Sequence, residues 1–387
     1  MPNFIAKTLS LPPFPFACGE VKFEWLARGG SEDMIFTRFK GHEFFVILKP
    51  HKNGVLVKGD KLTRPSDVAI LQGALVALRD AHAEGVSSNA IALRREKNEK
   101  KADFVLSEAE FLARLAVNKG KKLFIEIGFG SGRHLLFQAR ENPDTLVIGI
   151  EIYKPSIMQV ANLAALENLS NVALLNADAR LVLSLVASNS VDKVFLHFPV
   201  PWGDSPKRRV VSEYFAAEVE RVLKVGGRFE LRSDDRDYTD YSIATFLNLK
   251  SSRLEVFKNR FLEVSSKYED RWVRQNKDIY DMIFTCERTC QTREMGGEFK
   301  FEPIDPATLK IKFENKTIKG EDFFVHTERL YELEGGGVLL KVSFGSFYGP
   351  EQYYIEVSAN GAARYLVKEP LATISNLKAH EALKGML

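Results

Sequence analysis

A cluster of glycines at the end of an apolar run constrains the fold of this chain more than any other feature. Residues 123–127 form the run, and Gly128, Gly130 and Gly132 follow it at alternate positions. A helical pattern then covers residues 133–140. Glycine lets the backbone approach a ligand without a Cβ in the way, and a strand, a glycine loop and a helix in this order are typical of nucleotide-binding proteins. The loop alone does not distinguish one such ligand from another.

Two further apolar runs follow the loop, and each leads to an acidic residue. Residues 146–150 precede Glu151, residues 172–175 precede Asp178, and a helical pattern over 155–169 separates the two runs. Alternating strands and helices of this length predict a parallel sheet, and the carboxyl ends of parallel strands lie at one edge of it. The two acids therefore predict a ligand site at that edge.

Three carboxylates, one within or shortly after each of three predicted strands, favour some nucleotide-type ligands over others. Glu151 follows the last glycine by about 20 residues, the separation typical of a ribose-binding acid, and an acid there disfavours a 2′-phosphate. Asp178 can accept a hydrogen bond from the adenine amine. Glu126, just before the glycines, can meet a ligand ammonium. This set suits S-adenosylmethionine, which carries a sulfonium and an amino group, better than it suits the pyrophosphate of NAD.

Length and composition limit the number of domains and the class of protein in which these motifs occur. A chain of 387 residues with 45% hydrophobic content can bury a large core and predicts two or three domains, while a net charge of +3 does not by itself indicate nucleic-acid binding. The three cysteines predict a reducing, cytosolic compartment. Cys286 and Cys290 are interpreted as buried thiols rather than metal ligands. We expect no signal peptide, and no apolar stretch reaches the roughly 18 residues of a membrane span.

The pattern of apolar residues divides the chain into three predicted parts. Residues 1–104 are an α+β extension, 105–292 the ligand-binding α/β domain and 293–387 a β-rich C-terminal domain. In the first part, Ser66 is expected to cap a helix over 66–83. The strands expected in the two end parts cover residues 21–25, 34–39, 43–48, 55–57, 310–313, 323–326, 338–344, 352–357 and 363–367, and a last helix covers 373–383.

The central part shows further helix and strand signals. Ser107 and Glu110 are spaced as a capping box at the start of a helix. The other elements expected here are helices over 181–186, 212–223 and 238–249 and strands over 191–198, 228–232, 254–257 and 281–286.

Several motifs beyond the glycine loop carry a resemblance to one family. LFIEIGFGSG, GIEIYKPSI, NADAR, FPVPW followed by KRR, RSDD and SKYEDR occur in this order between about residues 121 and 284. The segment resembles the bacterial tRNA (guanine-N7)-methyltransferase family, here in a long form with extensions at both ends. The resemblance implies a Rossmann-like class I methyltransferase fold, with a mostly parallel sheet, helices on both faces and β-rich additions. It also implies S-adenosylmethionine as the donor and a guanine of the tRNA variable loop as the acceptor.

The resemblance also implies roles for individual residues. Glu126, Glu151 and Asp178 match the donor-binding acids of the family, beside the three glycines of the loop. Asp234 matches the family's acid after the fifth strand. Metal ions and membranes have no part in the implied activity.

The acceptor chemistry asks little of the protein. Guanine N7 has a free lone pair and loses no proton on methylation, so alignment with the sulfonium methyl can supply most of the acceleration. The product ring is cationic, and a nearby carboxylate stabilises its transition state. We predict Asp234 and Glu269 as the catalytic carboxylates, one near the developing charge and one on the N1 and N2 hydrogens of guanine. Ser266 and Glu269 match the family's Thr-x-x-Glu substrate motif, with serine in place of threonine.

Basic and aromatic residues near these motifs are predicted to contact tRNA, because phosphates attract lysine and arginine and exposed bases stack on aromatic rings. The expected substrate-binding residues are Trp202, Lys207, Arg208, Arg209, Asp234, Ser266, Glu269 and Arg271. For Trp202, core packing is an open alternative. The basic run 94–101 is interpreted first as a solvated linker and second as a phosphate contact.

One position departs from the family. Where the family has FPDPW, this chain has Val200, which can neither accept a hydrogen bond nor carry a charge. The family's lysine after the tryptophan also has no counterpart in the short loop before Lys207. Either the family's aspartate is not essential, or Asp204 or Asp234 acts in its place, or catalysis is weakened.

Three alternatives stay open on the sequence. A dehydrogenase would bind NAD in the same fold. A methyltransferase for another substrate would share the donor site without the downstream motifs. A catalytically weak RNA-binding or scaffold protein would keep the fold and tolerate Val200.

Overall fold

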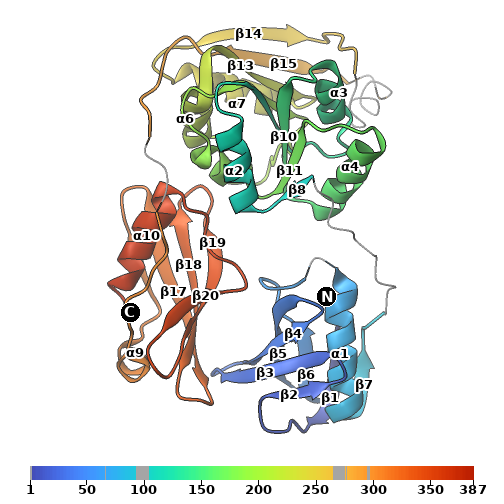
Figure 1. Ribbon diagram of the computed structural model, residues 1–387, viewed down its shortest axis with the longest axis vertical. Helices are drawn as coiled ribbons and strands as arrows, with labels where there is room; N and C mark the ends of the chain where they lie inside the picture. Colours follow the sequence, from blue (N-terminus) through green and yellow to red (C-terminus); the bar gives the residue numbers. More distant parts are fainter. Residues whose placement is uncertain (1, 66, 93–103, 265–274, 276, 294–296) are drawn as a thin grey trace. The chain divides into compact units, whose positions relative to one another are not determined.

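The computed structural model describes residues 2–65, 67–92, 104–264, 275, 277–293 and 297–387 (Figure 1). The chain forms two compact units. We call Glu99–Gly296 the central unit and Met1–Asn98 with Gly297–Leu387 the terminal unit. The predicted α/β domain, 105–292, lies within the central unit. The two end parts, predicted as separate domains, share one sheet in the terminal unit.

The central unit is built on an eight-stranded sheet in the order β14-β15-β13-β12-β9-β10-β11-β8. The strands from β13 to β8 run parallel, and β15 runs antiparallel to both β13 and β14. The strands are β8 (Val105–Leu106), β9 (Lys122–Ile127), β10 (Thr145–Glu151), β11 (Val172–Asn176), β12 (Val191–His197), β13 (Leu223–Ser233), β14 (Arg253–Lys258) and β15 (Tyr280–Thr285). The helices are α2 (Glu108–Val117), α3 (Arg133–Glu141), α4 (Lys154–Leu166), α5 (Ala179–Val182), η1 (Leu183–Leu185), η2 (Pro206–Arg208), α6 (Glu213–Val222) and α7 (Arg236–Leu247).

Both faces of the central sheet are covered by helices, as the sequence predicted (Figure 1). Successive side chains of a strand point to opposite faces. Ile125 of β9 therefore belongs to the core that includes α6 and α7, whereas Phe124 belongs to the core with α3 and α4. The predicted capping box is confirmed: Ser107 and Glu110 close the first turn of α2. The helix predicted over 212–223 is α6, and β13 begins directly after its last residue.

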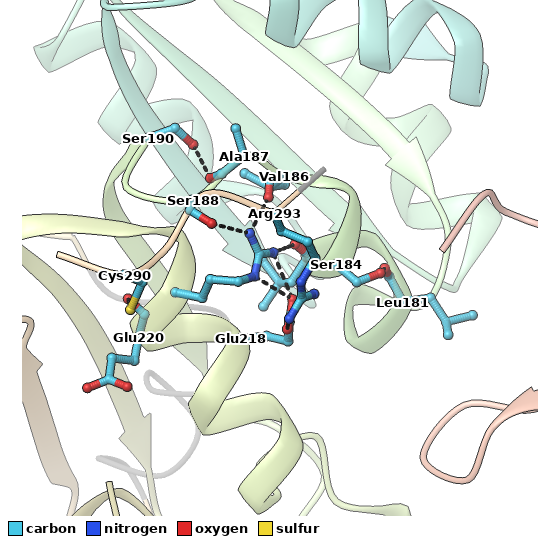
Figure 2. A network of polar contacts seen from close by, with 12 residues as sticks. Leu181, Ser184, Val186, Ala187, Ser188, Ser190, Glu218, Glu220, Cys290 and Arg293 are labelled. Atoms are coloured by element: carbon cyan, nitrogen blue, oxygen red, sulfur yellow. Dashed lines mark hydrogen bonds and ion pairs between the residues drawn. The ribbon is translucent and has the colours of Figure 1, made fainter. Parts of the chain in front are cut away.

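A network of polar contacts holds the segment that follows β15 against helix α6. Arg221 of α6 donates to the carbonyls of Val186 and Leu183 at 2.8 and 2.7 Å and pairs with Glu218 at 2.7 Å. Figure 2 shows Arg293 beside Glu218, to which it is paired at 2.8 Å. Because Arg221 and Glu218 are buried and Arg293 pairs with Glu218, the network fixes the position of the segment.

The two nearby cysteines belong to the same region. The thiols of Cys286 and Cys290 both contact the carbonyl of Glu220, at 3.6 and 3.8 Å, and burial raises the pKa of each. Within the described ranges, no group of three or more His, Cys, Asp or Glu side chains is arranged to hold a metal ion.

The terminal unit is built on a 12-stranded sheet in the order β20-β19-β18-β17-β3-β4-β5-β6-β1-β7, with β2 beside β3 and β16 beside β17. The strands of the first part are β1 (Asn3–Leu9), β2 (Phe16–Cys18), β3 (Val21–Arg28), β4 (Asp33–Phe39), β5 (His42–His51), β6 (Gly54–Gly59) and β7 (Ala83–Asn89). Those of the last part are β16 (Lys316–Lys319), β17 (Phe323–Leu333), β18 (Val338–Ser346), β19 (Glu351–Val357) and β20 (Ala363–Leu366). The helices are α1 (Val68–His82), α9 (Pro306–Lys312) and α10 (Ile374–Lys384).

The two ends of the chain meet where β3 pairs with β17. Around that pairing, Met34 and Phe36 of the first part share a core with Leu339 and Tyr354 of the last. The hydroxyl of Tyr354 donates to Asp60 at 3.3 Å. Because they share this core, the first and last parts of the chain form one compact unit although they are far apart in sequence.

Two predictions in the terminal unit were wrong in detail. The strand expected at 310–313 is part of helix α9, because Asp305 caps the amides of residues 307 and 308 and Pro306 supplies a first helical residue. Helix α1 is capped by Asp67, whose carboxylate accepts from the amide of Ala69 at 2.8 Å, rather than by the predicted Ser66, which is outside the described residues. No helix in the described residues is long and apolar enough to span a membrane.

Candidate active site

The carboxyl ends of the parallel strands lie at one edge of the central sheet, and most of the predicted site residues lie there. β9 pairs with β10 on one side and β12 on the other. The amide of Gly128, just past β9, donates to the carbonyl of Ile150 at 2.8 Å. Asn176, at the end of β11, donates to the carbonyl of Glu151 at 2.9 Å. The sequence motifs at three strand ends thus form one continuous rim.

The glycine loop adopts backbone conformations that favour glycine. Gly128, Gly130 and Gly132 all have positive φ, at 67°, 51° and 74°. A Cβ on Gly132 would lie 2.3 Å from a methyl carbon of Val160, so helix α4 packs directly against the loop. A Cβ on Gly128 would meet no atom within 4 Å, so the space beside this part of the loop is open.

Glu151 ties the glycine loop to the start of α4. One carboxylate oxygen accepts from the amides of Ile152 and Tyr153, at 2.8 and 3.0 Å. The other accepts from the amide of Gly130 at 3.2 Å. A carboxylate at a helix N-terminus is stabilised by the free amides there. Glu151, the last residue of β10, therefore orders the loop, and its contact with a ribose stays a prediction.

Asp178 caps α5 and is gripped by the arginine two residues later. Its carboxylate accepts from the amide of Arg180 at 2.9 Å and from the guanidinium at 2.5–3.1 Å. The hydrogen bonds to Asp178 raise the pKa of Arg180. A carboxylate has about four lone-pair sites, so the three N–H groups of Arg180 already use most of the acceptor capacity of Asp178.

Glu126 is buried below the loop and bonded to a histidine. It is 3% exposed, and its carboxylate lies 2.8 Å from Nδ1 of His134 on α3. The His134 ring lies next to that of His197, the last residue of β12, with ring centroids 4.4 Å apart. Burial, followed by electrostatic interactions with His134, Arg232 and Arg260, lowers the pKa of His197 well below its usual value.

The segment after β12 has an unusual backbone and an aromatic and basic surface. Phe198 and Trp202 both have positive φ, at 51° and 47°. Trp202 is 37% exposed, which removes the core-packing alternative, and the guanidinium of Arg208 lies 5.0 Å from its ring centroid. Arg209 donates to the carbonyl of Pro201 at 2.8 Å. Val200 is 61% exposed, so nothing in the fold requires an apolar residue there.

Arg209 also stacks on two aromatic rings of α7. Its guanidinium lies 5.1 Å from the centroid of Tyr238 and 4.9 Å from that of Tyr241. The hydroxyl of Tyr238 accepts from the amide of Val211 at 3.2 Å. This arginine therefore fixes the loop against α7, and of the two described basic side chains Arg208 is the better placed for an external contact.

Asp234 follows β13 and lies beside a lysine that the sequence did not suggest. Its carboxylate is 2.8 Å from Nζ of Lys277 and 18% exposed. The next residue, Asp235, caps α7 through the amide of Tyr238 at 2.7 Å. Of the two adjacent acids, only Asp234 has its carboxylate outside the helix.

Below Asp234, a buried ion pair joins β13 to β15. Arg232 contacts Asp281 at 2.6 and 2.8 Å and donates to the carbonyl of Arg260 at 3.0 Å. This pair fixes the antiparallel strand to the sheet beneath the predicted catalytic acid. Four predicted positions cannot be placed: the side chain of Lys207 and the residues Ser266, Glu269 and Arg271 are outside the described part of the chain, as is the run 94–101.

Sequence reasoning missed four residues that contact the predicted site. They are Arg180, His134, His197 and Lys277. Arg180 is only two residues from Asp178 and its motif, so proximity in sequence could have suggested it. The other three reach the site through the fold and have no local pattern that would mark them.

The strand order, with one antiparallel strand inserted beside the fifth parallel strand, and the acids at the strand ends define a class I methyltransferase of Rossmann-like fold. In agreement, residues 120–282 match a family described as putative methyltransferases.

Relatives that match along the whole chain identify the family. The tRNA (guanine-N(7)-)-methyltransferase of Campylobacter fetus is 52% identical over 391 residues, which cover 100% of this chain and 99% of the relative. The enzyme of that name from Wolinella succinogenes is 35% identical over 397 residues, covering 100% of both. The chain belongs to the tRNA (guanine-N(7)-)-methyltransferase family. The crystal structure of the 16S rRNA methyltransferase KamB covers 47% of this chain and 95% of that one, with 18% identity and a TM-score of 0.37.

Proposed function

We propose that this chain transfers the methyl group of S-adenosylmethionine to N7 of a guanine in the variable loop of tRNA, forming 7-methylguanosine. The observation that carries the proposal is the full-length match, at 52% identity, to a relative named tRNA (guanine-N(7)-)-methyltransferase. Because tRNA is a cytoplasmic substrate, we propose that the protein acts in the cytoplasm.

The donor half of the proposal is supported by the chemistry of the strand ends. S-adenosylmethionine supplies an electrophilic methyl group on a sulfonium, and it also carries a ribose, an adenine and an ammonium. We assign Glu151 to the ribose hydroxyls, Asp178 to the adenine amine and Glu126 to the ammonium. The open space beside Gly128 leaves room for a ligand to approach the loop backbone.

The acceptor half rests on Asp234 and, by resemblance, on Glu269. N7 of guanine needs no general base, so the protein has to orient the ring and stabilise its developing charge. Asp234 suits this task because its carboxylate projects from a strand end and is held by Lys277 rather than by its own helix. Glu269, with Ser266, is assigned to the hydrogens of the guanine base.

For tRNA contacts, we assign Trp202 and Arg208 to exposed bases or phosphates of the substrate. The exposed indole with a guanidinium over it is a surface on which a nucleobase can stack. Lys207, Arg209 and Arg271 complete the proposed basic surface, with Arg209 acting chiefly by holding the loop against α7.

The direct test is transfer of tritium from labelled S-adenosylmethionine to total tRNA, followed by borohydride and aniline cleavage at 7-methylguanosine. We expect labelled tRNA that is cleaved at one variable-loop guanine. Label in tRNA without that cleavage would assign the chain to another methylation site. Tight tRNA binding without label would support the alternative that Val200 raises, a catalytically weak RNA-binding protein.

Asp234→Asn tests the proposed catalytic acid. At saturating tRNA, we expect the rate of methyl transfer to fall by roughly a hundredfold, because the carboxylate that faces the cationic ring is lost. Asp240→Asn on α7 is the matched control, since Asp240 is exposed and pairs with Arg236. Lys277→Met removes the ion pair but keeps the carboxylate of Asp234, so its rate distinguishes the loss of that carboxylate from the loss of the ion pair. A full rate for Asp234→Asn would remove Asp234 from the catalytic assignment.

A further inference from the structure

A chain of hydrogen bonds runs from the surface of α3 to the buried carboxylate of Glu126. Asn142 donates to the carbonyl oxygen of the Gln138 side chain at 3.5 Å, which turns the Gln138 amide nitrogen toward His134. That nitrogen lies 3.1 Å from Nε2 of His134, and Nδ1 of His134 lies 2.8 Å from Glu126. Since Nε2 accepts from an amide, the proton of the neutral ring is on Nδ1 and points at the carboxylate.

This arrangement fixes the rotamer of Glu126. An ionised carboxylate with 3% exposure would be costly without a donor close by. His134 supplies that donor and is itself held by Gln138 and by the edge of the Phe195 ring, 4.7 Å between centroids. The support reaches the carboxylate from a helix on one face of the sheet, so it persists whether or not a ligand is bound.

His197 lies next to this chain but is not part of it. Its ring is 4.4 Å from that of His134 and 5.8 Å from that of Phe195, and no hydrogen bond to its nitrogens is formed by any residue that the structure describes. His197 ends β12, directly beside the end of β9 and the glycine loop. A half-buried imidazole without a partner, at the edge where ligands bind in such folds, has an open acceptor.

We propose that His134 and His197 form the amino-acid end of the donor site, with His134 positioning the Glu126 carboxylate and His197 offering a ring nitrogen as a second acceptor for the donor's ammonium. The proposal rests on the proposed function, in which the donor is S-adenosylmethionine. It adds two residues to the donor site. Glu151 and Asp178 at the strand ends hold the nucleoside, while Glu126, His134 and His197 hold the charged amino-acid end.

Charge around His197 agrees with that role. The charged or titratable groups that act on it are His134 from α3, Arg232 from β13 and Arg260 after β14. Asp281 neutralises Arg232. Burial and the neighbouring positive groups lower the pKa of His197, so the ring is neutral at pH 7 and can accept from an ammonium. A protonated ring in this place would instead repel a cationic donor.

The test is equilibrium binding of small ligands to the full chain without tRNA, measured by calorimetry. The probes are S-adenosylhomocysteine, which has the ammonium, and methylthioadenosine, which lacks the amino-acid end. His134→Phe keeps a ring of similar size without a donor, and we expect it to weaken S-adenosylhomocysteine by about ten- to a hundredfold with little change for methylthioadenosine. His134→Asn, whose amide nitrogen can replace Nδ1, should restore most of the affinity. His197→Phe should cost a smaller factor, again only for the ligand with the ammonium.

Equal loss for both probes in His134→Phe would mean that the histidine merely supports the fold, and the proposal would be wrong. Unchanged binding of S-adenosylhomocysteine in both variants would overturn it as well. A wild-type chain that binds neither probe would contradict the donor assignment itself, whereas normal probe binding with no tRNA methylation would contradict only the proposed acceptor. Lowering the pH supplies an independent readout, since S-adenosylhomocysteine affinity should fall in the wild type as the pH approaches the lowered pKa of His197 and change less in His197→Phe.

Discussion

Two histidines, the buried His380 and the half-buried His197, differ in what their ring nitrogens contact. His380 of α10 is 0% exposed, with Nδ1 2.9 Å from the hydroxyl of Tyr365 and Nε2 2.9 Å from the carbonyl of Lys300. His197 of the central unit lies against another ring, and in the described ranges nothing hydrogen-bonds to it. Burial lowers the pKa of both histidines. The terminal unit thus satisfies its buried imidazole, and the central unit leaves one with an open acceptor.

The same contrast holds for carboxylates. Glu328 in β17 is surrounded by Ser343, Gln352 and Lys341, at 2.5–2.8 Å, and its contacts are all side chains of the same sheet. Glu151 accepts only from backbone amides at a strand end. Each carboxylate has three partners, but Glu328 lies within a strand, whereas Glu151 lies at the carboxyl end of β10, the edge of a parallel sheet at which ligands bind in such folds. We therefore predict that the donor binds to the central unit.

The largest effect is expected for stability, from the ion pair under the proposed catalytic acid. Asp281→Ala leaves the buried Arg232 without its carboxylate, and removing one partner of such a pair costs about 3–5 kcal/mol. Glu334→Ala in the terminal unit breaks the exposed pair with Arg28, which contributes about 0.2–1 kcal/mol. Urea unfolding of the two variants measures the difference. Similar losses would show that the pair under β13 is solvated in solution.

The next effect separates ligand binding from stability. Glu151→Ala removes an acceptor shared by three amides, including that of Gly130, and we expect S-adenosylhomocysteine affinity to fall by roughly a hundredfold. Glu328→Ala is the matched change in the terminal unit, and it should lower the unfolding midpoint without altering that affinity. Calorimetry and thermal unfolding of both variants test the contrast. A loss of donor affinity in Glu328→Ala would mean that the terminal unit contributes to the donor site.

Much of the central unit could be predicted from the sequence, because its first three long strands are apolar runs that are followed by a glycine or an acid. The sheet, the helices on both faces and the capping box at Ser107 are confirmed. Local periodicity determines such elements, and the carboxyl ends of parallel strands necessarily share an edge. The assignments of Asp234 and Glu126 to particular atoms of a ligand stay predictions.

The remaining features depend on contacts between residues far apart in sequence. Pairing of β3 with β17 joins the two ends of the chain, and neither strand carries a signal that names its partner. The partners of the site acids also come from distant parts of the sequence. Lys277, which contacts Asp234, is 43 residues away from it. At 310–313, alternation favoured a strand, and the stronger capping signal of Asp305 and Pro306 was overlooked.

The smallest effect is the pH dependence of stability in the two units. A histidine whose folded pKa is lowered binds its proton more readily when unfolded, so the stability that it contributes is present above about pH 6.5 and is lost as the pH falls toward the folded pKa. The loss cannot exceed about 1.4 kcal/mol per pH unit for one group. For His197 we expect amide exchange in β12 to accelerate below pH 6.5, less so in His197→Phe and less so with saturating S-adenosylhomocysteine. For His380, exchange in α10 should accelerate in the same range and should not respond to that ligand. Slower amide exchange in α10 with the ligand bound would mean that ligand binding to the central unit affects the terminal unit. It would contradict the contrast between His380, whose ring nitrogens both have partners, and His197.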